Sequence, residues 1–183
     1  MNTYPVLKTK YTSSPVTVEQ AKNWLRLDIP DFTEDDSKIQ DLINAAVSYV
    51  EKECNLSLGV STYEWYTDCL PCKFADTCNV TSIFSIEQEI DDDFVSIADT
   101  EYKRIPTSET TSRIRWKSSF KATGSFFRTT FTAGYDEGKI PHRLLQAVRA
   151  LIAEWYDDPG DYVREKKTMA DRLLQPYVIA YAG

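Results

Sequence analysis

The spacing of apolar residues predicts two long amphipathic helices in this chain. Between His142 and Asp157, large apolar side chains recur every three or four residues, which places them on one side of a helix. Pro141 precedes this segment, where a helix tolerates a residue without an N–H, and Pro159-Gly160 ends it. A second stripe of this kind runs from about Glu34 to Cys54. Each helix therefore needs a partner that covers its apolar side.

Two shorter helices are expected nearer the ends of the chain. Thr17 and Gln20 have the spacing of a capping box, in which each side chain accepts a hydrogen bond from the other residue's backbone. A helix is expected to follow Thr17 and to end at Pro30. Asp161 is expected to cap a last helix that Pro176 stops. The pattern thus predicts about four helices.

The segment between the two long helices has a different pattern. From Val60 to Thr132, short runs of β-branched and aromatic residues are separated by turn-forming residues, which is typical of strands. This pattern predicts a meander of roughly five or six antiparallel strands. The predicted strands lie in the runs 60–68, 79–87, 94–98, 102–105, 113–117 and 125–134.

These elements indicate an α+β protein, in which a small helical bundle carries an antiparallel β meander inserted between its second and third helices. We expect residues 17–58 and 139–176 to form the helical core and residues 59–138 to form the inserted β region. Residues 1–16 are expected to form an extended N-terminal arm, and residues 177–183 a short apolar C-terminal tail.

The charge of the chain limits the partners that it can have. A net charge of −7 argues against a dedicated nucleic-acid binder, because holding phosphates requires a surplus of Lys and Arg. It does not exclude a protein that DNA merely passes. No apolar run is long enough to span a bilayer, and the N-terminus lacks the apolar core of a signal peptide. We therefore expect a cytosolic protein without a membrane partner.

Charged residues gather in three parts of the sequence. Asp35 and Asp36 belong to an acidic linker that enters the helix after Glu34, where carboxylates favour the positive end of the helix dipole. Consecutive aspartates follow the second predicted strand, at the expected tip of a hairpin, and these are Asp91, Asp92 and Asp93. Basic residues dominate the later strands, namely Lys103, Arg104, Arg113, Arg115, Lys117, Lys121 and Arg128.

The sequence does not contain the pattern of a known catalytic apparatus. His142 is the only histidine, and it falls in the first turn of a predicted helix, where a surface position is expected. Glycine motifs that cradle phosphates are absent, so no nucleotide cofactor is expected. The acidic residues 87–93 could bind Mg²⁺ for a DNA-packaging nuclease, which is one alternative function. Consecutive aspartates at a hairpin tip more often form a solvated turn.

The four cysteines leave two interpretations open. Cys69 and Cys72 have the spacing of a zinc knuckle, and Cys54 and Cys78 would complete four ligands. This set would make the chain a small zinc-stabilised binding module, the second alternative function. A four-cysteine site usually consists of two such close pairs, whereas this sequence has one. We therefore prefer free or partly buried thiols, with no metal and no cofactor.

The order of these elements resembles the head–tail connector (adaptor) family of tailed bacteriophages, in particular its longer members with a β insertion. The resemblance runs from about residue 15 to residue 177. The residues that carry it are Pro15-Val16-Thr17-Val18-Glu19-Gln20-Ala21-Lys22, Leu25-Arg26-Leu27-Asp28, Asp35-Asp36, Ile39, Leu42, Ile43, Ala45, Ala46, Tyr49, Val50, Glu51, Val80, Ser82-Ile83, Ala133-Gly134-Tyr135, Ile140-Pro141, Ala147 through Trp155-Tyr156, Leu173-Leu174 and Pro176-Tyr177.

This resemblance implies a structural virion protein and not an enzyme. Such proteins form a ring, typically of about twelve copies, beneath the portal of the filled head, and the ring extends the DNA channel. The expected partners are the portal protein, neighbouring copies and the next neck or tail completion protein, while DNA passes through the lumen without specific binding. The expected locations are the head–tail interface of the virion and, during assembly, the cytoplasm of the host bacterium.

The resemblance and the charge pattern together suggest which residues form interfaces. A closed ring needs two unlike faces on each subunit, which the acidic residues 28–36 and 87–93 and the basic residues 103–128 can supply. The family further implies that the C-terminal helix and tail, about residues 161–183, contact the portal. The candidate interface residues are Asp35, Asp36, Asp91, Asp92, Asp93, Arg113, Arg115, Arg172, Tyr177 and Tyr181.

Overall fold

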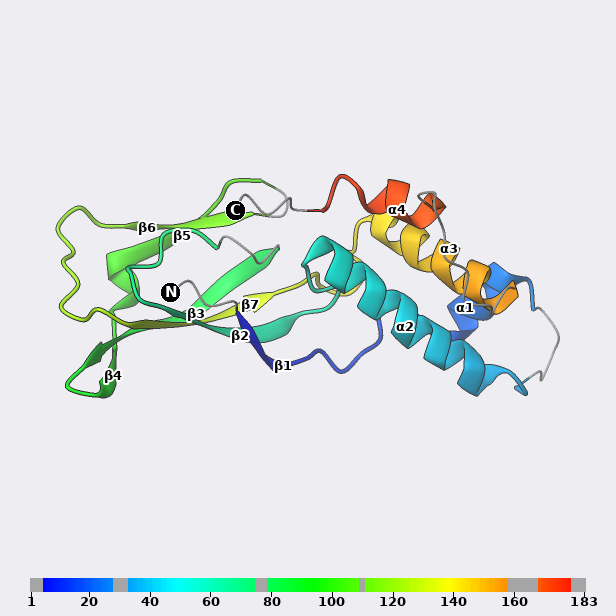
Figure 1. The fold of residues 1–183 in the computed structure, drawn as a ribbon, viewed down its shortest axis with the longest axis horizontal. Helices are drawn as coiled ribbons and strands as arrows, with labels where there is room; N and C mark the ends of the chain where they lie inside the picture. Colours follow the sequence, from blue (N-terminus) through cyan, green and yellow to red (C-terminus); the bar gives the residue numbers. More distant parts are fainter. Residues whose placement is uncertain (1–4, 28–32, 75–78, 109–110, 158–167, 179–183) are drawn as a thin grey trace. The chain divides into compact units, whose positions relative to one another are not determined.

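The computed structural model of the protein describes residues 5–27, 33–74, 79–108, 111–157 and 168–178. These residues form two compact units (Figure 1). The helical unit contains Ser13–Cys54 and Glu137–Val178, and the β unit contains the residues up to Thr12 together with Asn55–Asp136. The chain is thus an α+β protein, whose described residues form four α-helices and antiparallel sheet.

The helices of the helical unit are α1 (Val18–Leu25), α2 (Asp36–Cys54), α3 (His142–Asp157) and α4 (Met169–Leu174). Helices α2 and α3 lie side by side, and α4 packs on α3 (Figure 1). The buried apolar side chains of α2 and α3 form the core of this unit. Ile39, Ile43, Leu144 and Ile152 are among the side chains with no exposed surface. Burial of each such side chain contributes about 1.5–3 kcal/mol, and this is what holds the helices together. None of the helices formed by the described residues is long and apolar enough to cross a membrane.

The ends of the short helices follow local capping rules. The predicted capping box of α1 is confirmed, since Thr17 Oγ1 accepts from the backbone of Gln20 and Gln20 Oε1 accepts from the backbone of Thr17. This helix ends at Leu25, before the expected Pro30, because Arg26 adopts a left-handed conformation. Helix α4 begins after Thr168, which forms a capping box with Asp171. The predicted cap Asp161 lies outside the described residues.

In the described part of the β unit, seven strands form two antiparallel sheets. The larger sheet has the order β1-β2-β7-β3-β4, so the last strand in sequence lies between β2 and β3. The smaller sheet is the hairpin β5–β6. All six predicted runs contain a strand, and the N-terminal arm supplies the additional edge strand β1. The strands are β1 (Val6–Thr9), β2 (Ser61–Thr67), β3 (Val80–Ile90), β4 (Asp93–Ser96), β5 (Tyr102–Pro106), β6 (Ser112–Trp116) and β7 (Phe127–Ala133).

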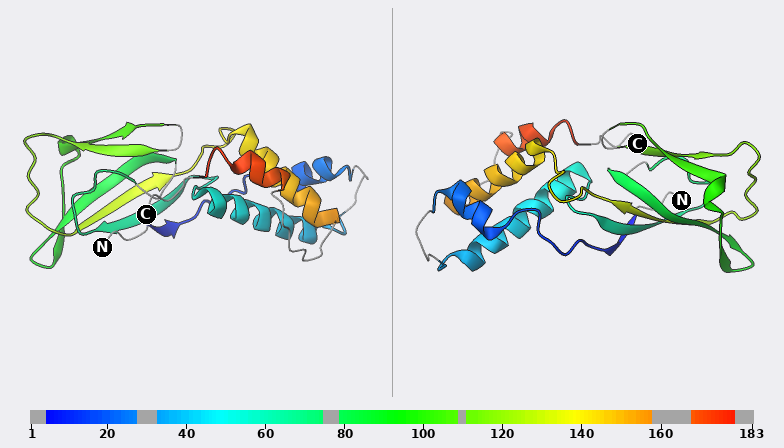
Figure 2. Two further views of the ribbon diagram at one scale, coloured as in Figure 1. Left: turned by 45° about the horizontal axis from the view of Figure 1, so that its top comes forward. Right: turned by 180° about the vertical axis from the view of Figure 1, so that it is seen from behind.

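The hairpin β5–β6 lies over one face of the larger sheet (Figure 2). The space between these two layers is filled by one apolar cluster, in which Phe127 and Phe131 of β7 are completely buried. Ile114 of β6 belongs to the same cluster, and Trp116 packs against it. Side chains alternate between the two faces of a strand, so the inward position of Ile114 directs Arg113 and Arg115 outward. The packing of the core thereby determines which charges reach the surface.

Candidate functional site

Three consecutive carboxylates stand at the tip of the hairpin β3–β4. Asp91 and Asp92 form its two-residue turn, both with positive φ, which is the type I′ geometry that Asp adopts readily. Asp93 begins β4 opposite Ile90. All three residues are exposed, and none forms an ion pair with another described residue. We refer to Asp91–Asp93 as the acidic tip.

A basic surface lies on the outward side of the hairpin β5–β6. Lys103 stands directly opposite Arg115 in the register, and Arg113 follows on the same side two residues along β6. Lys73 forms an isolated bridge with Arg113 and adds a fourth cation. Within the described part of the chain, none of Lys103, Arg113 and Arg115 forms an ion pair. We call these three residues the basic face.

Two acidic residues lie beside one end of the basic face. An open hollow of about 770 Å³ is lined by residues 99–103 and 115–119, so that Asp99 and Glu101 lie near Lys103 and Arg115. Glu101 pairs with Lys117, with 3.4 Å between Nζ and Oε1. Arg113 and its neighbour Lys73, at the other end of the face, do not line this hollow.

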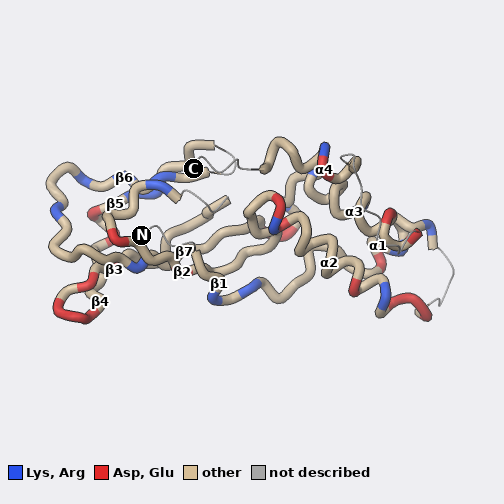
Figure 3. Tube along the Cα trace, in the orientation of Figure 1, with Lys and Arg blue, Asp and Glu red and all other residues tan. Residues whose placement is uncertain are grey.

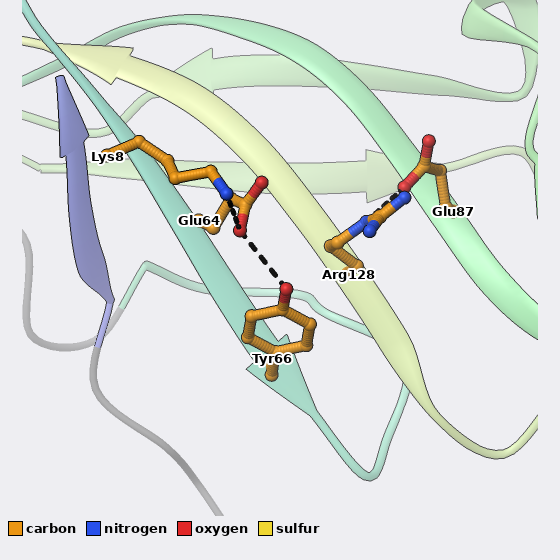
Figure 4. Close-up of polar contacts among 5 residues, drawn as sticks. All are labelled: Lys8, Glu64, Tyr66, Glu87 and Arg128. Atoms are coloured by element: carbon orange, nitrogen blue, oxygen red, sulfur yellow. Dashed lines mark hydrogen bonds and ion pairs between the residues drawn. The ribbon is translucent and has the colours of Figure 1, made fainter. Parts of the chain in front are cut away.

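Four other charged residues of the β unit are paired within the larger sheet (Figure 4). Glu87 of β3 accepts a hydrogen bond from Nε of Arg128 of β7, and this bond raises the pKa of Arg128. Glu64 Oε2 lies 3.2 Å from Lys8 Nζ and accepts a hydrogen bond of 3.1 Å from the Tyr66 hydroxyl. Part of the predicted basic and acidic sets is therefore satisfied inside one chain.

The acidic residues at the start of α2 also have partners in their own unit. Asp35 Oδ2 accepts a hydrogen bond of 2.6 Å from the Tyr156 hydroxyl, which raises the pKa of Tyr156. Asp36 forms an ion pair with Lys22 of α1. These contacts connect α2 to α1 and α3. A stabilising role inside the helical unit accounts for both carboxylates.

The C-terminal candidates lie on or just after α4. Arg172 is exposed in the last turn of this helix, and the half-buried Tyr177 donates its backbone N–H to the Leu174 carbonyl at 2.8 Å. Tyr181 lies outside the described residues. Asp171 holds α4 through two contacts. It forms the capping box with Thr168, and it accepts a hydrogen bond of 3.0 Å from the Tyr49 hydroxyl of α2.

Replacing Tyr49 with phenylalanine tests this connection. Burial and the hydrogen bond to Asp171 raise the pKa of Tyr49 from 10.0 to about 12. Because the pKa of Tyr49 is higher in the folded state, its neutral hydroxyl contributes fully to stability below pH 10. This contribution is lost as the pH rises towards 12. Tyr49→Phe should therefore cost about 1 kcal/mol at pH 8 and progressively less above pH 10. Urea unfolding of both proteins at pH 8 and pH 11 measures the difference. A difference that stays constant with pH would contradict this role of the hydroxyl.

The cysteines do not gather around a common point among the described residues. Cys54 is buried in the helical unit, where its Sγ lies 4.0 Å from the Leu174 carbonyl oxygen and burial raises its pKa to about 11. Cys69 and Cys72 are exposed in the β unit, and Cys78 lies outside the described residues. No group of three or more His, Cys, Asp and Glu side chains in the described ranges is placed to hold a metal ion. His142 is exposed at the start of α3.

Two surface features did not follow from sequence reasoning. The direct opposition of Lys103 and Arg115 depends on the β5–β6 register, which a list of basic residues does not reveal. Phe84 is 79% exposed because the pairing of β3 with β7 shifts between Ile83 and Ser85, and such bulges turn a side chain out of the regular alternation. The sequence does contain a signal for the opposition of Lys103 and Arg115, because the turn-forming residues 107–111 between two short strands suggest a hairpin and hence a register.

Comparison with solved structures finds the same fold in particles of a gene transfer agent (GTA). One match is to a chain in the virion of a native gene transfer agent particle, with a TM-score of 0.79, 18% identity and coverage of 98% of each chain. A second is to a chain in the neck of an empty GTA particle computed with C6 symmetry, with a TM-score of 0.76, 18% identity and coverage of 97% and 98%. A third is to a chain in the neck of a native GTA particle computed with C12 symmetry, with a TM-score of 0.67 and 15% identity over 97% and 98%.

Sequence comparison gives the family. No curated protein matches the chain. The family model described as Phage gp6-like head-tail connector protein matches residues 15–122, which are more than half of the sequence. The matched region begins just before the capping box of α1 and extends beyond β6. This chain therefore belongs to the family of phage gp6-like head-tail connector proteins.

Proposed function

We propose that this protein forms a ring beneath the portal of a phage-like particle and connects the head to the neck or tail. The observation that carries this proposal is the family match over residues 15–122. The family consists of structural connectors and not of enzymes, so interfaces take the place of an active site. Support also comes from the fold, because the similar chains belong to a virion and to particle necks computed with C6 and C12 symmetry.

The ring proposal includes a channel through which DNA passes. With a net charge of −7, the chain repels phosphates on average, which suits a surface along which DNA has to slide. The expected neighbours are the portal, further copies in a ring of about twelve and the next neck or tail completion protein. Assembly would take place in the cytoplasm of a host bacterium, and the product would reside at the head–tail interface.

We further infer that the β region is an insertion in a helical connector core. The element order places β2 to β7 between α2 and α3, and these strands belong to a compact unit separate from the helices. The core would comprise residues 17–58 and 139–176, and the insertion residues 59–138, with the arm at 1–16 and the tail at 177–183. In this arrangement the helices and the strands can serve different neighbours.

The C-terminal end is the proposed contact with the portal. Deleting Gln175–Gly183 should abolish binding to the portal while the remaining chain stays folded, because the core of the helical unit ends at Leu174. Negative-stain imaging of the protein with its portal, together with sedimentation of the mixture, measures this effect. A truncated chain that still forms portal-bound rings would contradict the assignment.

A charge reversal tests the same contact without shortening the chain, so a folding defect caused by truncation cannot explain its result. Arg172→Glu changes an exposed residue of α4 and should weaken portal binding by about tenfold, while Arg149→Glu changes an exposed residue of α3 and should not. Equal binding by both variants would remove α4 from the interface. Failure of the wild-type chain to bind any portal or to form a ring would overturn the proposed function itself.

A further inference from the structure

The internal ion pairs of the chain leave two sets of charges without partners. Glu87 is paired with Arg128, Glu101 with Lys117 and Asp36 with Lys22. Once these pairs are set aside, the acidic tip and the basic face remain as clusters without ion pairs in the described part of the β unit. Among the charges without an ion pair, the three carboxylates of the acidic tip are consecutive in the sequence, and the three cations of the basic face lie side by side on β5 and β6.

The basic face is costly for an isolated subunit. Lys103 and Arg115 stand directly opposite each other on two paired strands, and like charges in this position destabilise the pairing. Arg113 extends the same row, with Lys73 beside it. An anionic partner that covers the row would remove this repulsion. The arrangement is therefore suited to a surface that is neutralised in an assembly.

The acidic tip has the shape of a projecting contact. Its turn is only two residues long and lies between paired strands. The backbone of the three consecutive carboxylates is therefore held close together. Figure 3 shows the acidic tip at the end of β3–β4 and basic residues along β5 and β6, in different places of the β unit. A subunit with unlike charges at two separate places forms head-to-tail contacts, which is the type of contact that closes into a ring.

We propose that the acidic tip of one copy binds the basic face of the next copy. This inference rests on the ring proposed above and identifies the part of the β unit through which neighbouring copies recognise each other. The occupant is a second copy because the same chain supplies both surfaces, which carry opposite charge and have no ion-pair partner among the described residues. The two-residue turn of the acidic tip is held between paired strands, so little backbone entropy is lost there when the contact forms.

Two complementary variants test this contact. The face variant, Arg113→Glu/Arg115→Glu, reverses two cations and makes position 115 a favourable partner for Lys103. The tip variant, Asp91→Asn/Asp92→Asn/Asp93→Lys, reverses the sign of the tip while asparagine tolerates the positive φ of the turn. Each variant should associate about 10–100-fold more weakly than the wild type, as measured by sedimentation equilibrium with and without portal.

Mixing the two variants gives the decisive measurement. In an alternating assembly, the reversed face of one variant meets the reversed tip of the other, and the remaining two surfaces keep their original signs. The mixture should therefore associate more tightly than either variant alone. The melting temperature of the face variant should equal or exceed that of the wild type, because a repulsive cross-strand pair becomes an attractive one. If the face variant associates more weakly but is as stable as the wild type, the weaker association results from the lost contact and not from a folding defect.

Other results would overturn the inference in distinguishable ways. If wild-type rings form and neither variant changes them, the contact is wrong while the proposed function stands. If the face variant assembles normally but loses binding to duplex DNA, the basic face binds nucleic acid and not a second copy. A wild-type chain that neither self-associates nor assembles with portal contradicts both proposals. Arg143→Glu/Arg149→Glu, which reverses two exposed cations of α3, is the matched control and should leave self-association unchanged.

Discussion

Replacing Gly134 with alanine is expected to unfold the β unit at temperatures at which the wild-type chain remains folded. Gly134 has a φ of +132°, a conformation that residues with a side chain rarely adopt and that costs about 1–3 kcal/mol. A Cβ atom at this position would also lie 2.8 Å from Val60 Cα and closer still to the carbonyl group of Gly59. Because these neighbours are backbone atoms, they cannot move aside without displacing the start of β2.

We expect the combined cost of strain and displacement to exceed about 3 kcal/mol. Gly134 also donates its N–H to the Asn79 carbonyl at 3.1 Å, and Asn79 Nδ2 donates to the Ser57 carbonyl at 2.8 Å, so a displacement would spread through several bonds. Thermal unfolding followed by circular dichroism measures the effect. Gly138→Ala is the matched control, since Gly138 also has positive φ but no atom lies within 4 Å of its added Cβ. Equal melting temperatures for the two variants would disprove the close backbone contact.

Local sequence signals predicted the elements well because their causes are local. The capping box of α1 needs only Thr17 and Gln20, and the stripe of α2 needs only the helical repeat. The same holds for the hairpin tip, where Asp91 and Asp92 themselves favour the turn. The capping box of Thr168 and Asp171 was not predicted, because aspartate stands at the position where Glu or Gln is usual.

The arrangement of the strands could not be predicted in the same way. Strand β7 lies between β2 and β3, although more than 35 residues separate its start from the end of β3. Such pairing depends on the burial of Phe127 and Phe131 in the cluster between the two sheets, which only the packed structure defines. The internal pair between Glu87 and Arg128 follows from this placement. Without it, both residues would have been counted among the charges available for partners.

Replacing Phe131 with alanine should cost about 3–5 kcal/mol, and the loss should extend to the basic face. The Phe131 ring has no exposed surface, stacks on Tyr63 with 5.7 Å between ring centroids and meets Phe74 edge-on at 4.9 Å. Since Ile114 belongs to the same cluster, a cavity at Phe131 loosens the support of β6 and hence the positions of the arginines on either side.

The exposed Phe84 of the neighbouring strand offers the same substitution without a cavity. Phe84→Ala should change the free energy of unfolding by no more than about 0.5 kcal/mol. Urea unfolding of both variants gives the stabilities, and sedimentation equilibrium gives their self-association. If Phe131→Ala lowers both quantities, the basic face depends on the core beneath it. If it lowers stability but leaves self-association of the folded fraction unchanged, the arginines do not need a fixed β6, and the rigid pairing of tip and face loses its physical basis.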